Sequence, residues 1–226
     1  MKALDLLLDF IYPKRCVVCG VILNINNTVN LCLSCNEIVK TTKGIKVKDI
    51  QIKTTKNLDK VDSLYSIFEY KQVRKGIQHF KFDGCKNNGI LLGDIMSIVA
   101  GRENAGIFTN KDIIIPVPIH SKKYKQRGFN QAKILAERVS VRRNIPIVNN
   151  SLVRVLNTVP QSEFDKKRRK ENVKNAFVVE NKKLIEGKRI LLIDDIDTTG
   201  ATINECARVL LQAGAKKVSG FTLTTD

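Results

Sequence analysis

Short apolar runs alternate with segments of helical periodicity from residue 61 to the end of the chain. The expected elements are, in order, strand 64–70, helices 73–80 and 89–101, strand 112–118, helix 130–143, a strand-like run at 145–155, strand 190–193, helix 202–212 and strand 218–223. The runs at 112–118 and 190–193 are almost wholly apolar, as is typical of parallel strands buried on both faces. We therefore predict an α/β domain over residues 61–226, with a parallel sheet between helices.

Residues 1–60 follow a different pattern, because they carry a cysteine cluster and then a polar stretch from 40 to 60. The cluster has the spacing Cys-x-x-Cys, twelve residues, Cys-x-x-Cys, and its members are Cys16, Cys19, Cys32 and Cys35. Two such pairs can present four thiolates to one tetrahedral site, which favours Zn²⁺ in a structural role. Two disulfides are the alternative, and a reducing compartment disfavours them. We predict a small zinc-ribbon module with an N-terminal helix and a linker.

The apolar runs are too short for a membrane protein, since a spanning helix needs roughly 20 apolar residues. Residues 1–10 contain Asp5 and Asp9 within their apolar stretch, whereas a secretory signal has an uninterrupted apolar core. The sequence therefore predicts a cytoplasmic protein without a membrane span.

The chain has a net charge of +17, and the excess lies in one segment. Residues 120–189 hold 19 basic and 6 acidic residues, whereas residues 190–226 hold 3 and 5. The segment includes five consecutive cations, which are Lys166, Lys167, Arg168, Arg169 and Lys170. Such a cluster is either a solvated surface or a contact for polyanions, and we carry it as a candidate contact to DNA. Aromatic residues make up only 6%, which disfavours a stacking platform for single strands.

The most informative run is residues 189–202, Arg-Ile-Leu-Leu-Ile-Asp-Asp-Ile-Asp-Thr-Thr-Gly-Ala-Thr. Asp194 and Asp195 follow an apolar strand, at the end where open α/β sheets bind ligands. Gly200 lets the backbone approach a phosphate, and the amides of the next helix favour an anion there. Two acids beside a phosphate cradle suit a ribose diol. The run therefore predicts a phosphorylated-ribose site, with a plain acidic turn as the alternative; neither a P-loop nor a three-glycine Rossmann loop is present.

This run resembles the phosphoribosyl pyrophosphate signature of type I phosphoribosyltransferases, in which apolar residues precede two acids and a Thr/Gly-rich loop. The resemblance implies that Asp194 and Asp195 bind the ribose hydroxyls and take part in catalysis, with Mg²⁺ bridging pyrophosphate and ribose. The ribose phosphate would be held by Thr198, Thr199, Gly200, Ala201 and Thr202. Asp197 departs from the pattern, since relatives carry an apolar or aromatic residue there, and we expect it to face solvent.

A second resemblance covers nearly the whole chain. The stretch Ile-Pro-Val-Pro-Ile-His at 115–120, Arg-Gly-Phe-Asn-Gln at 127–131, the cysteine module and matches at 161–177 resemble the ComF (ComFC) competence proteins. This resemblance implies a zinc ribbon joined to a phosphoribosyltransferase-like domain, and a role in natural transformation. By fold analogy the loop after Pro118 would contact pyrophosphate, with Ser121, Lys122 and Arg127 as candidate donors. The segment 154–174 resembles in position a flexible loop that closes over such sites.

Two hypotheses follow for the function. In the first, the protein binds phosphoribosyl pyrophosphate and serves DNA uptake and handling, with single- or double-stranded DNA and other competence proteins as partners. In the second, it is a metabolic phosphoribosyltransferase that acts on an unidentified nucleobase or amine. The sequence leaves open whether transfer is catalysed, and it also leaves open whether His120 is a general acid or base or a solvated loop residue.

Overall fold

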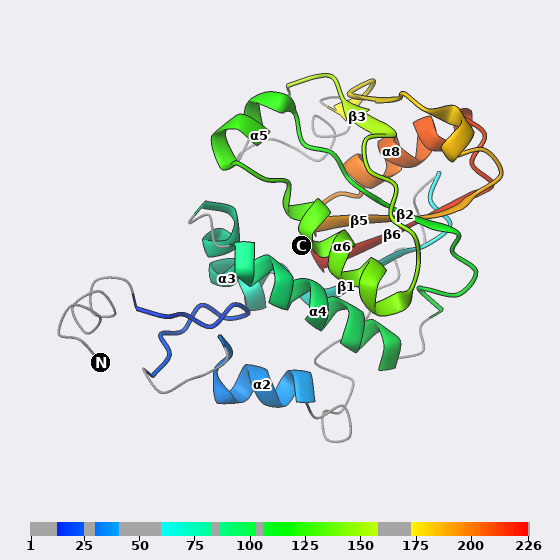
Figure 1. The fold of residues 1–226 in the computed structure, drawn as a ribbon. Helices are drawn as coiled ribbons and strands as arrows, with labels where there is room; N and C mark the ends of the chain where they lie inside the picture. The colour runs from blue at the N-terminus through cyan, green and yellow to red at the C-terminus, as the bar shows by residue number, and fades with distance from the viewer. Residues whose placement is uncertain are drawn as a thin grey trace.

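The computed structural model describes residues 13–24, 30–40, 60–82, 86–102, 106–157 and 173–225. Figure 1 shows the arrangement of its helices and strands. In chain order they are α2 (Leu33–Lys40), β1 (Leu64–Glu69), α3 (Tyr70–Phe82), α4 (Lys86–Arg102), β2 (Ile113–Pro116), α5 (Ser121–Arg127), α6 (Gln131–Arg143), β3 (Leu152–Arg154), β4 (Phe177–Val179), the 3₁₀ turn η1 (Lys182–Leu184), β5 (Arg189–Asp197), α8 (Ala201–Gln212) and β6 (Lys217–Thr225).

The central sheet has the strand order β1-β6-β5-β2, and every neighbouring pair in it is parallel. β5 lies between β2 and β6, with Ile190 aligned to Ile113 on one side and to Val218 on the other. β3 and β4 form a separate antiparallel pair. The predicted α/β class with a parallel sheet is therefore confirmed.

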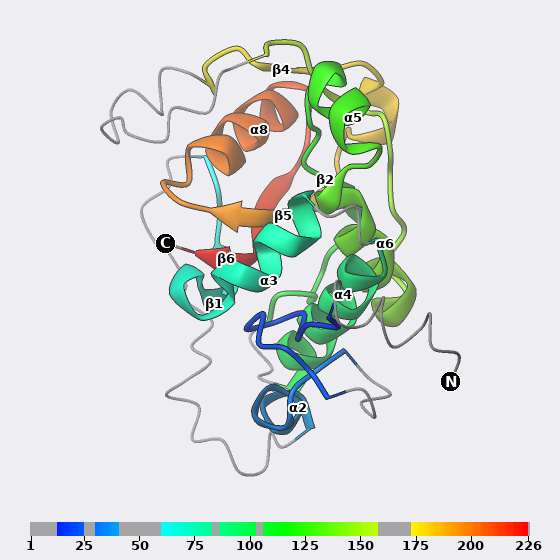
Figure 2. The ribbon, with the colours of Figure 1, turned by 90° about the vertical axis from the view of Figure 1, so that its left-hand side faces the viewer.

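Helices cover both faces of this sheet, as Figures 1 and 2 show. Side chains alternate along a strand, so Leu191 and Ile193 join the core with α3, α4 and α6. Ile190 and Leu192 join the other core, which includes residues of α8. All four side chains are fully buried, which explains why the sequence shows an unbroken apolar run here.

Some elements differ from the expectation. β5 does not end at Ile193, because its pairing with β6 continues through the acidic residues to Asp197. The apolar run at 145–155 makes one bridge, between Ile147 and Ile114, and then β3. α5 was not predicted because none of its residues is buried, so it has no apolar periodicity to find.

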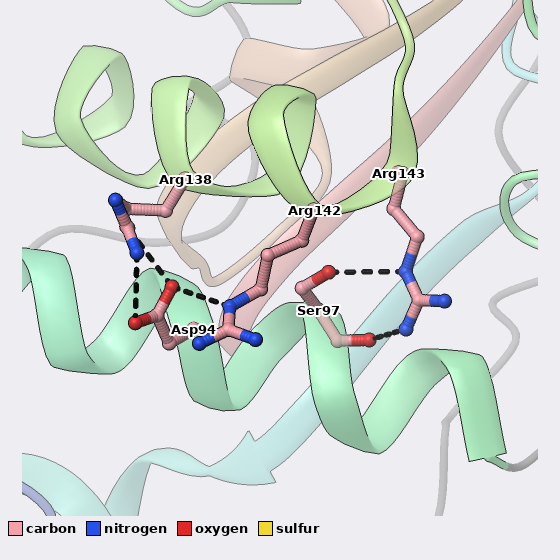
Figure 3. A network of polar contacts seen from close by, with 5 residues as sticks. All are labelled: Asp94, Ser97, Arg138, Arg142 and Arg143. Atoms are coloured by element: carbon pink, nitrogen blue, oxygen red, sulfur yellow. Dashed lines mark hydrogen bonds and ion pairs between the residues drawn. The ribbon is translucent and has the colours of Figure 1, made fainter.

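A polar clasp joins α4 to α6 (Figure 3). Asp94 of α4 accepts two hydrogen bonds from Arg138, at 2.9 and 3.0 Å, and one from Arg142 at 2.7 Å. One turn further along α4, Ser97 accepts from Arg143 through its hydroxyl and its carbonyl oxygen. The clasp fixes α6, whose N-terminal end approaches the site described next.

Candidate functional site

The two acids at the end of β5 point toward opposite layers of the fold. Asp195 continues the row of Ile193 toward α3, where Lys81 Nζ lies 2.9 Å from Asp195 Oδ2. Asp194 continues the row of Leu192 toward α8, and its charge acts on Cys206 in that helix and on Arg154. Asp194 Oδ1 also accepts a hydrogen bond from the backbone N–H of Asp195 at 2.8 Å.

The surroundings of these carboxyl groups push their pKa values apart. Burial raises the pKa of Asp194 well above its usual value, and the neighbouring negative charge of Asp195 raises it further. Burial would also raise the pKa of Asp195, but the charge of Lys81 and its hydrogen bond outweigh burial and lower it. The two carboxyl groups therefore differ in acidity, and Asp195 loses its proton at a lower pH than Asp194 does.

The loop after the acids is organised by Asp197. This side chain is only 7% exposed, and its Oδ1 accepts a hydrogen bond from the backbone N–H of Gly200 at 2.7 Å. The expectation that Asp197 faces solvent is therefore wrong. Gly200 has a φ of 71°, in the left-handed region that favours glycine, and it caps α8. Burial raises the pKa of Asp197 although the amides of Gly200 and Thr198 offset part of the effect.

The other predicted loop residues lie at the N-terminal end of α8. Thr198 is exposed, whereas Thr199, Ala201 and Thr202 are partly buried. The Thr199 hydroxyl accepts from the backbone N–H of Ala201 at 3.4 Å. The sequence-predicted cradle is therefore one continuous turn between the acids and a twelve-residue helix. Such an end concentrates amide donors and partial positive charge.

The second predicted loop, after β2, is tied back to the sheet by Asn130. Its side chain caps α6 by accepting from the Ala132 amide at 3.0 Å, and it donates to the carbonyl oxygen of Val117 at 3.0 Å. Arg127 donates to Gln131 Oε1 at 3.2 Å, and its charge acts on Asp195. Of the candidate donors, the structure thus brings Arg127 toward the acids.

His120 has a different role from those considered in the sequence. Its Nδ1 accepts a hydrogen bond from the backbone N–H of Lys122 at 3.2 Å, and the residue is the N-cap of α5. The lone pair of Nδ1 satisfies a backbone N–H at the start of the helix, so His120 stabilises the N-terminal end of α5. Ser121 and Lys122 follow it and are exposed.

Lys123, which was not predicted, is the lysine of α5 that lies among the site's cations. Burial lowers its pKa, and the positive charges of Arg154, Arg127 and Lys81 lower it further. Arg154, at the end of β3, lies with its guanidinium carbon 5.3 Å from the centre of the Phe177 ring. Four cations from three separate elements, α3, α5 and β3, therefore lie around the two acids, an arrangement suited to a ligand with several negative charges.

The remaining sequence candidates are placed as follows. Lys166, Lys167, Arg168, Arg169, Lys170 and Cys85 lie outside the described residues. Cys206 of α8 is buried in the core, and burial raises the pKa of its thiol well above the usual value, so this cysteine packs in the core.

The four predicted cysteines come together. Their sulfur atoms all lie within 4.8 Å of one another, and Cys19 Sγ is 3.7 Å from Cys32 Sγ. Sulfurs arranged tetrahedrally about 2.3 Å from zinc would be about 3.8 Å apart. A hydrogen bond with Cys35 lowers the pKa of Cys16 to about 4, so one thiolate forms readily. The cluster can hold a metal ion such as zinc, and four thiolates leave no open position for water.

Comparison with known families identifies the larger part of the chain. Residues 86–225 match the phosphoribosyl transferase domain. The chain belongs to this family. The match begins at α4 and ends in β6, so it includes both acids, the loop after β5 and the loop after β2.

Competence proteins are among the curated relatives. Competence protein F of Haemophilus influenzae is 37% identical over 108 residues, which are 47% of each chain. Competence protein ComFC of Bacillus subtilis is 38% identical over 113 residues, covering 49% of this chain and 43% of the relative. The predicted resemblance to the ComF proteins is confirmed, although the matched part spans about half the length of these relatives.

The solved structures that are similar to this chain share little sequence with it. One of them is the glutamine phosphoribosylpyrophosphate amidotransferase of B. subtilis, solved with ADP and GMP. It is 19% identical to this chain with a TM-score of 0.40, and the aligned region covers 59% of this chain and 25% of the amidotransferase chain.

Within the described part of the chain, no helix combines the length and apolar character needed to cross a membrane.

Proposed function

We propose that this protein binds phosphoribosyl pyrophosphate, together with Mg²⁺, at the C-terminal edge of its sheet. The observation that supports this most is that the acids at the end of β5 lie among cations, of which Lys81 pairs with Asp195 and Lys123 and Arg154 are partly buried. The acids suit the hydroxyls of the ribose, and the turn into α8 suits its phosphate. Lys123, Arg127 and Arg154 suit the charge of the pyrophosphate, while Lys81 pairs with Asp195. Mg²⁺, when bound, would neutralise part of that charge.

Asp195 is the residue on which this proposal depends most. As an ionised group it accepts hydrogen bonds from the ribose hydroxyls and stabilises positive charge that develops at the anomeric carbon. Burial raises the pKa of Asp194, and in its protonated form this carboxyl group donates one hydrogen bond and accepts others. Thr198, Thr199 and Thr202 add hydroxyl donors around the phosphate, while Ser121 and Lys122 are exposed at the start of α5.

Calorimetry tests this function directly. Mg²⁺–phosphoribosyl pyrophosphate should bind with micromolar affinity, and Asp195→Asn should weaken binding at least tenfold. Glu137→Gln is a matched control, since Glu137 also pairs with a lysine but lies exposed on α6 at 3.8 Å from Lys133. No heat with the wild type, or equal binding by Asp195→Asn, would remove the proposal. Ribose 5-phosphate and pyrophosphate, titrated separately, divide the affinity between the two halves of the site.

We further propose that this sugar-phosphate site serves natural transformation in a cytoplasmic protein that handles incoming DNA. The relatives named as competence proteins support this role. A disruption of the gene should lower the recovery of transformants while leaving DNA binding at the cell surface unchanged. Restoring the wild-type gene should restore transformation, and restoring the Asp195→Asn variant should not. Equal rescue by both would separate the competence role from the site.

Membership of the phosphoribosyl transferase domain family favours a second candidate, a metabolic transferase. Transfer would join a nucleobase or amine to the anomeric carbon as pyrophosphate leaves, with the cations stabilising the leaving group. A screen of nucleobases and amines for pyrophosphate release, with the Asp194→Asn/Asp195→Asn double variant as control, tests it. Release that requires one acceptor and both acids supports the transferase.

A further inference from the structure

The cysteine cluster packs on α3 backbone against backbone. A Cβ atom added at Gly76, in the middle of α3, would lie 2.0 Å from the carbonyl oxygen of Val17 and 2.5 Å from that of Val18. A Cβ added at Gly20 would lie 2.4 Å from the Cβ of Lys75. Contacts this close leave no room for side chains, so the turn between Cys16 and Gly20 and the helix fix each other's position.

The same contact belongs to the main core. Cys16, Val17 and Val18 are at most 3% exposed, and they form one cluster with Val73 and Ile77 of α3. In Figure 2 the dark blue segment that carries the first cysteine pair lies below α3 and in front of α4, and its buried residues share one core cluster with residues of both helices. The cluster is therefore joined to the sheet through α3.

α3 in turn carries a residue of the site. Lys81 follows Gly76 by five residues, in the last turn of the helix, and its Nζ lies 2.9 Å from Asp195 Oδ2. Both side chains are shielded, at 19% and 12% exposed, so this ion pair is little screened by water. One helix thus contacts the cysteine turn at its centre and the acid at its end.

We propose that the cysteine cluster, by fixing α3 and with it Lys81, controls the sugar-phosphate site, so that loading the cluster with metal raises the affinity of that site. The inference rests on the proposed function. The coupling acts through the ion pair between Lys81 and Asp195. A buried carboxylate that loses its lysine takes up a proton, and it then no longer accepts hydrogen bonds from two ribose hydroxyls. Lys81 is accordingly a positioning residue.

The metal dependence of binding tests the inference. The full chain, loaded with Zn²⁺ or stripped with a chelator, is titrated with Mg²⁺–phosphoribosyl pyrophosphate after circular dichroism shows that both forms are folded. Stripping should weaken binding about 5- to 10-fold, within the range of allosteric coupling. Lys81→Met should weaken binding by a similar factor, and stripping should then add little, because both changes act on the same ion pair.

Matched variants separate coupling from general damage. Lys81→Arg keeps the charge and should retain most of the affinity, while Lys71→Met removes an exposed lysine from the same helix and should change nothing. Gly76→Ala forces the turn away from α3 without touching a thiol, so it should weaken ligand binding while zinc content stays unchanged. Gln78→Ala, exposed on α3, is its control.

Two outcomes overturn the inference. If loaded and stripped wild type bind equally well, the cluster does not control the site, and the proposed function still stands. If loaded wild type does not bind at all, the proposed function fails. The coupling between the cysteine cluster and Asp195 is then tested without ligand, by the ¹³C resonance of the Asp195 carboxyl group. That resonance should shift on stripping in the wild type and in Lys71→Met, but not in Lys81→Met; an unchanged resonance refutes the link between cluster and acid.

Discussion

Asp197 accepts a hydrogen bond from the backbone N–H of Gly200 at 2.7 Å, across the turn that leads from β5 into α8. A buried carboxylate thus organises a loop whose proposed ligand is a phosphate. The negative charges of the Asp197 carboxylate and of a bound phosphate repel each other. Burial already raises the pKa of Asp197. The residue therefore strengthens the shape of the loop and weakens its charge complementarity.

Asp197→Asn separates these effects, because an amide oxygen still accepts from Gly200 while the charge is gone. We expect tighter binding of phosphoribosyl pyrophosphate, by about fivefold, or about 1 kcal/mol. Asp197→Ala should instead loosen the loop and weaken binding. Titrations of both variants and the wild type with this ligand at several pH values check this. At a given pH the ligand has the same ionisation state in every titration, so the ratio of two affinities reports only the difference between the proteins. The advantage of Asp197→Asn should grow as pH rises, and an advantage that shrinks would contradict the role of charge.

Asp194 should make the folded protein less stable as pH rises. Burial raises its pKa in the folded state, so between the unfolded value of about 3.9 and the raised folded value the folded form binds more protons. Across that window the free energy of unfolding falls, and above it the loss is constant. Asp194→Asn should match the wild type near pH 4 and exceed it at pH 7 by about 1 kcal/mol. Urea unfolding at several pH values measures the difference, with the exposed Glu180→Gln as control.

The loop after β5 could be predicted because its signals are local. Apolar strand residues, two acids and a Gly/Thr turn occur in one run, and the strand fixes where each side chain points. Lys81 could not be found in this way, since it reaches Asp195 from a helix 114 residues earlier in the chain. Its signal, a lysine directly after the buried Phe80, becomes informative only when the sheet order is known.

The choice of Lys122 over Lys123 shows a second limit. α5 contains no buried residue, so no periodicity indicated a helix or which lysine would face inward. The helix begins at Ser121, and the residue before it, His120, has a side chain that is an uncommon N-cap. The cysteine cluster is the opposite case, because its spacing alone predicts that the four sulfurs meet. What spacing does not reveal is that the cluster packs on α3.

Asp94 should stabilise the fold through the clasp that Figure 3 shows. Burial would raise its pKa, but hydrogen bonds from Arg142 and Arg138 outweigh burial and lower it. A depressed folded pKa gives stability that is present above the unfolded value of about 3.9 and is lost as pH falls through the folded value. Asp94→Asn should lower the free energy of unfolding at pH 7 by about 1–2 kcal/mol, less than for a fully buried pair because both arginines are partly exposed.

Thermal unfolding of Asp94→Asn, compared at pH 7 and pH 3, checks the clasp. The exposed pair of Lys133 and Glu137 offers a matched control on the same helix, and Glu137→Gln should change stability by less than about 0.5 kcal/mol. Equal effects of the two substitutions at pH 7 would show that the clasp adds nothing beyond a surface ion pair.

The basic cluster tests the DNA hypothesis, and it comprises Lys166, Lys167, Arg168, Arg169 and Lys170. Electrostatic binding releases counterions, so the logarithm of affinity should fall linearly with the logarithm of salt concentration. Replacing all five with glutamine should weaken binding to both single- and double-stranded DNA. For duplex DNA the slope should become shallower by about 0.9 for each phosphate that the protein no longer neutralises.

The control for this prediction removes the same charge elsewhere. Exposed lysines suitable for replacement are Lys60, Lys182, Lys183, Lys188 and Lys216. Lys60, Lys188 and Lys216 precede strands of the parallel sheet, at the edge opposite to the acids. If DNA retention at low salt depends only on net charge, both sets of substitutions reduce it equally, and the cluster is not the DNA-binding surface. If the cluster is that surface, the control keeps the wild-type salt slope while the cluster variant has a shallower one.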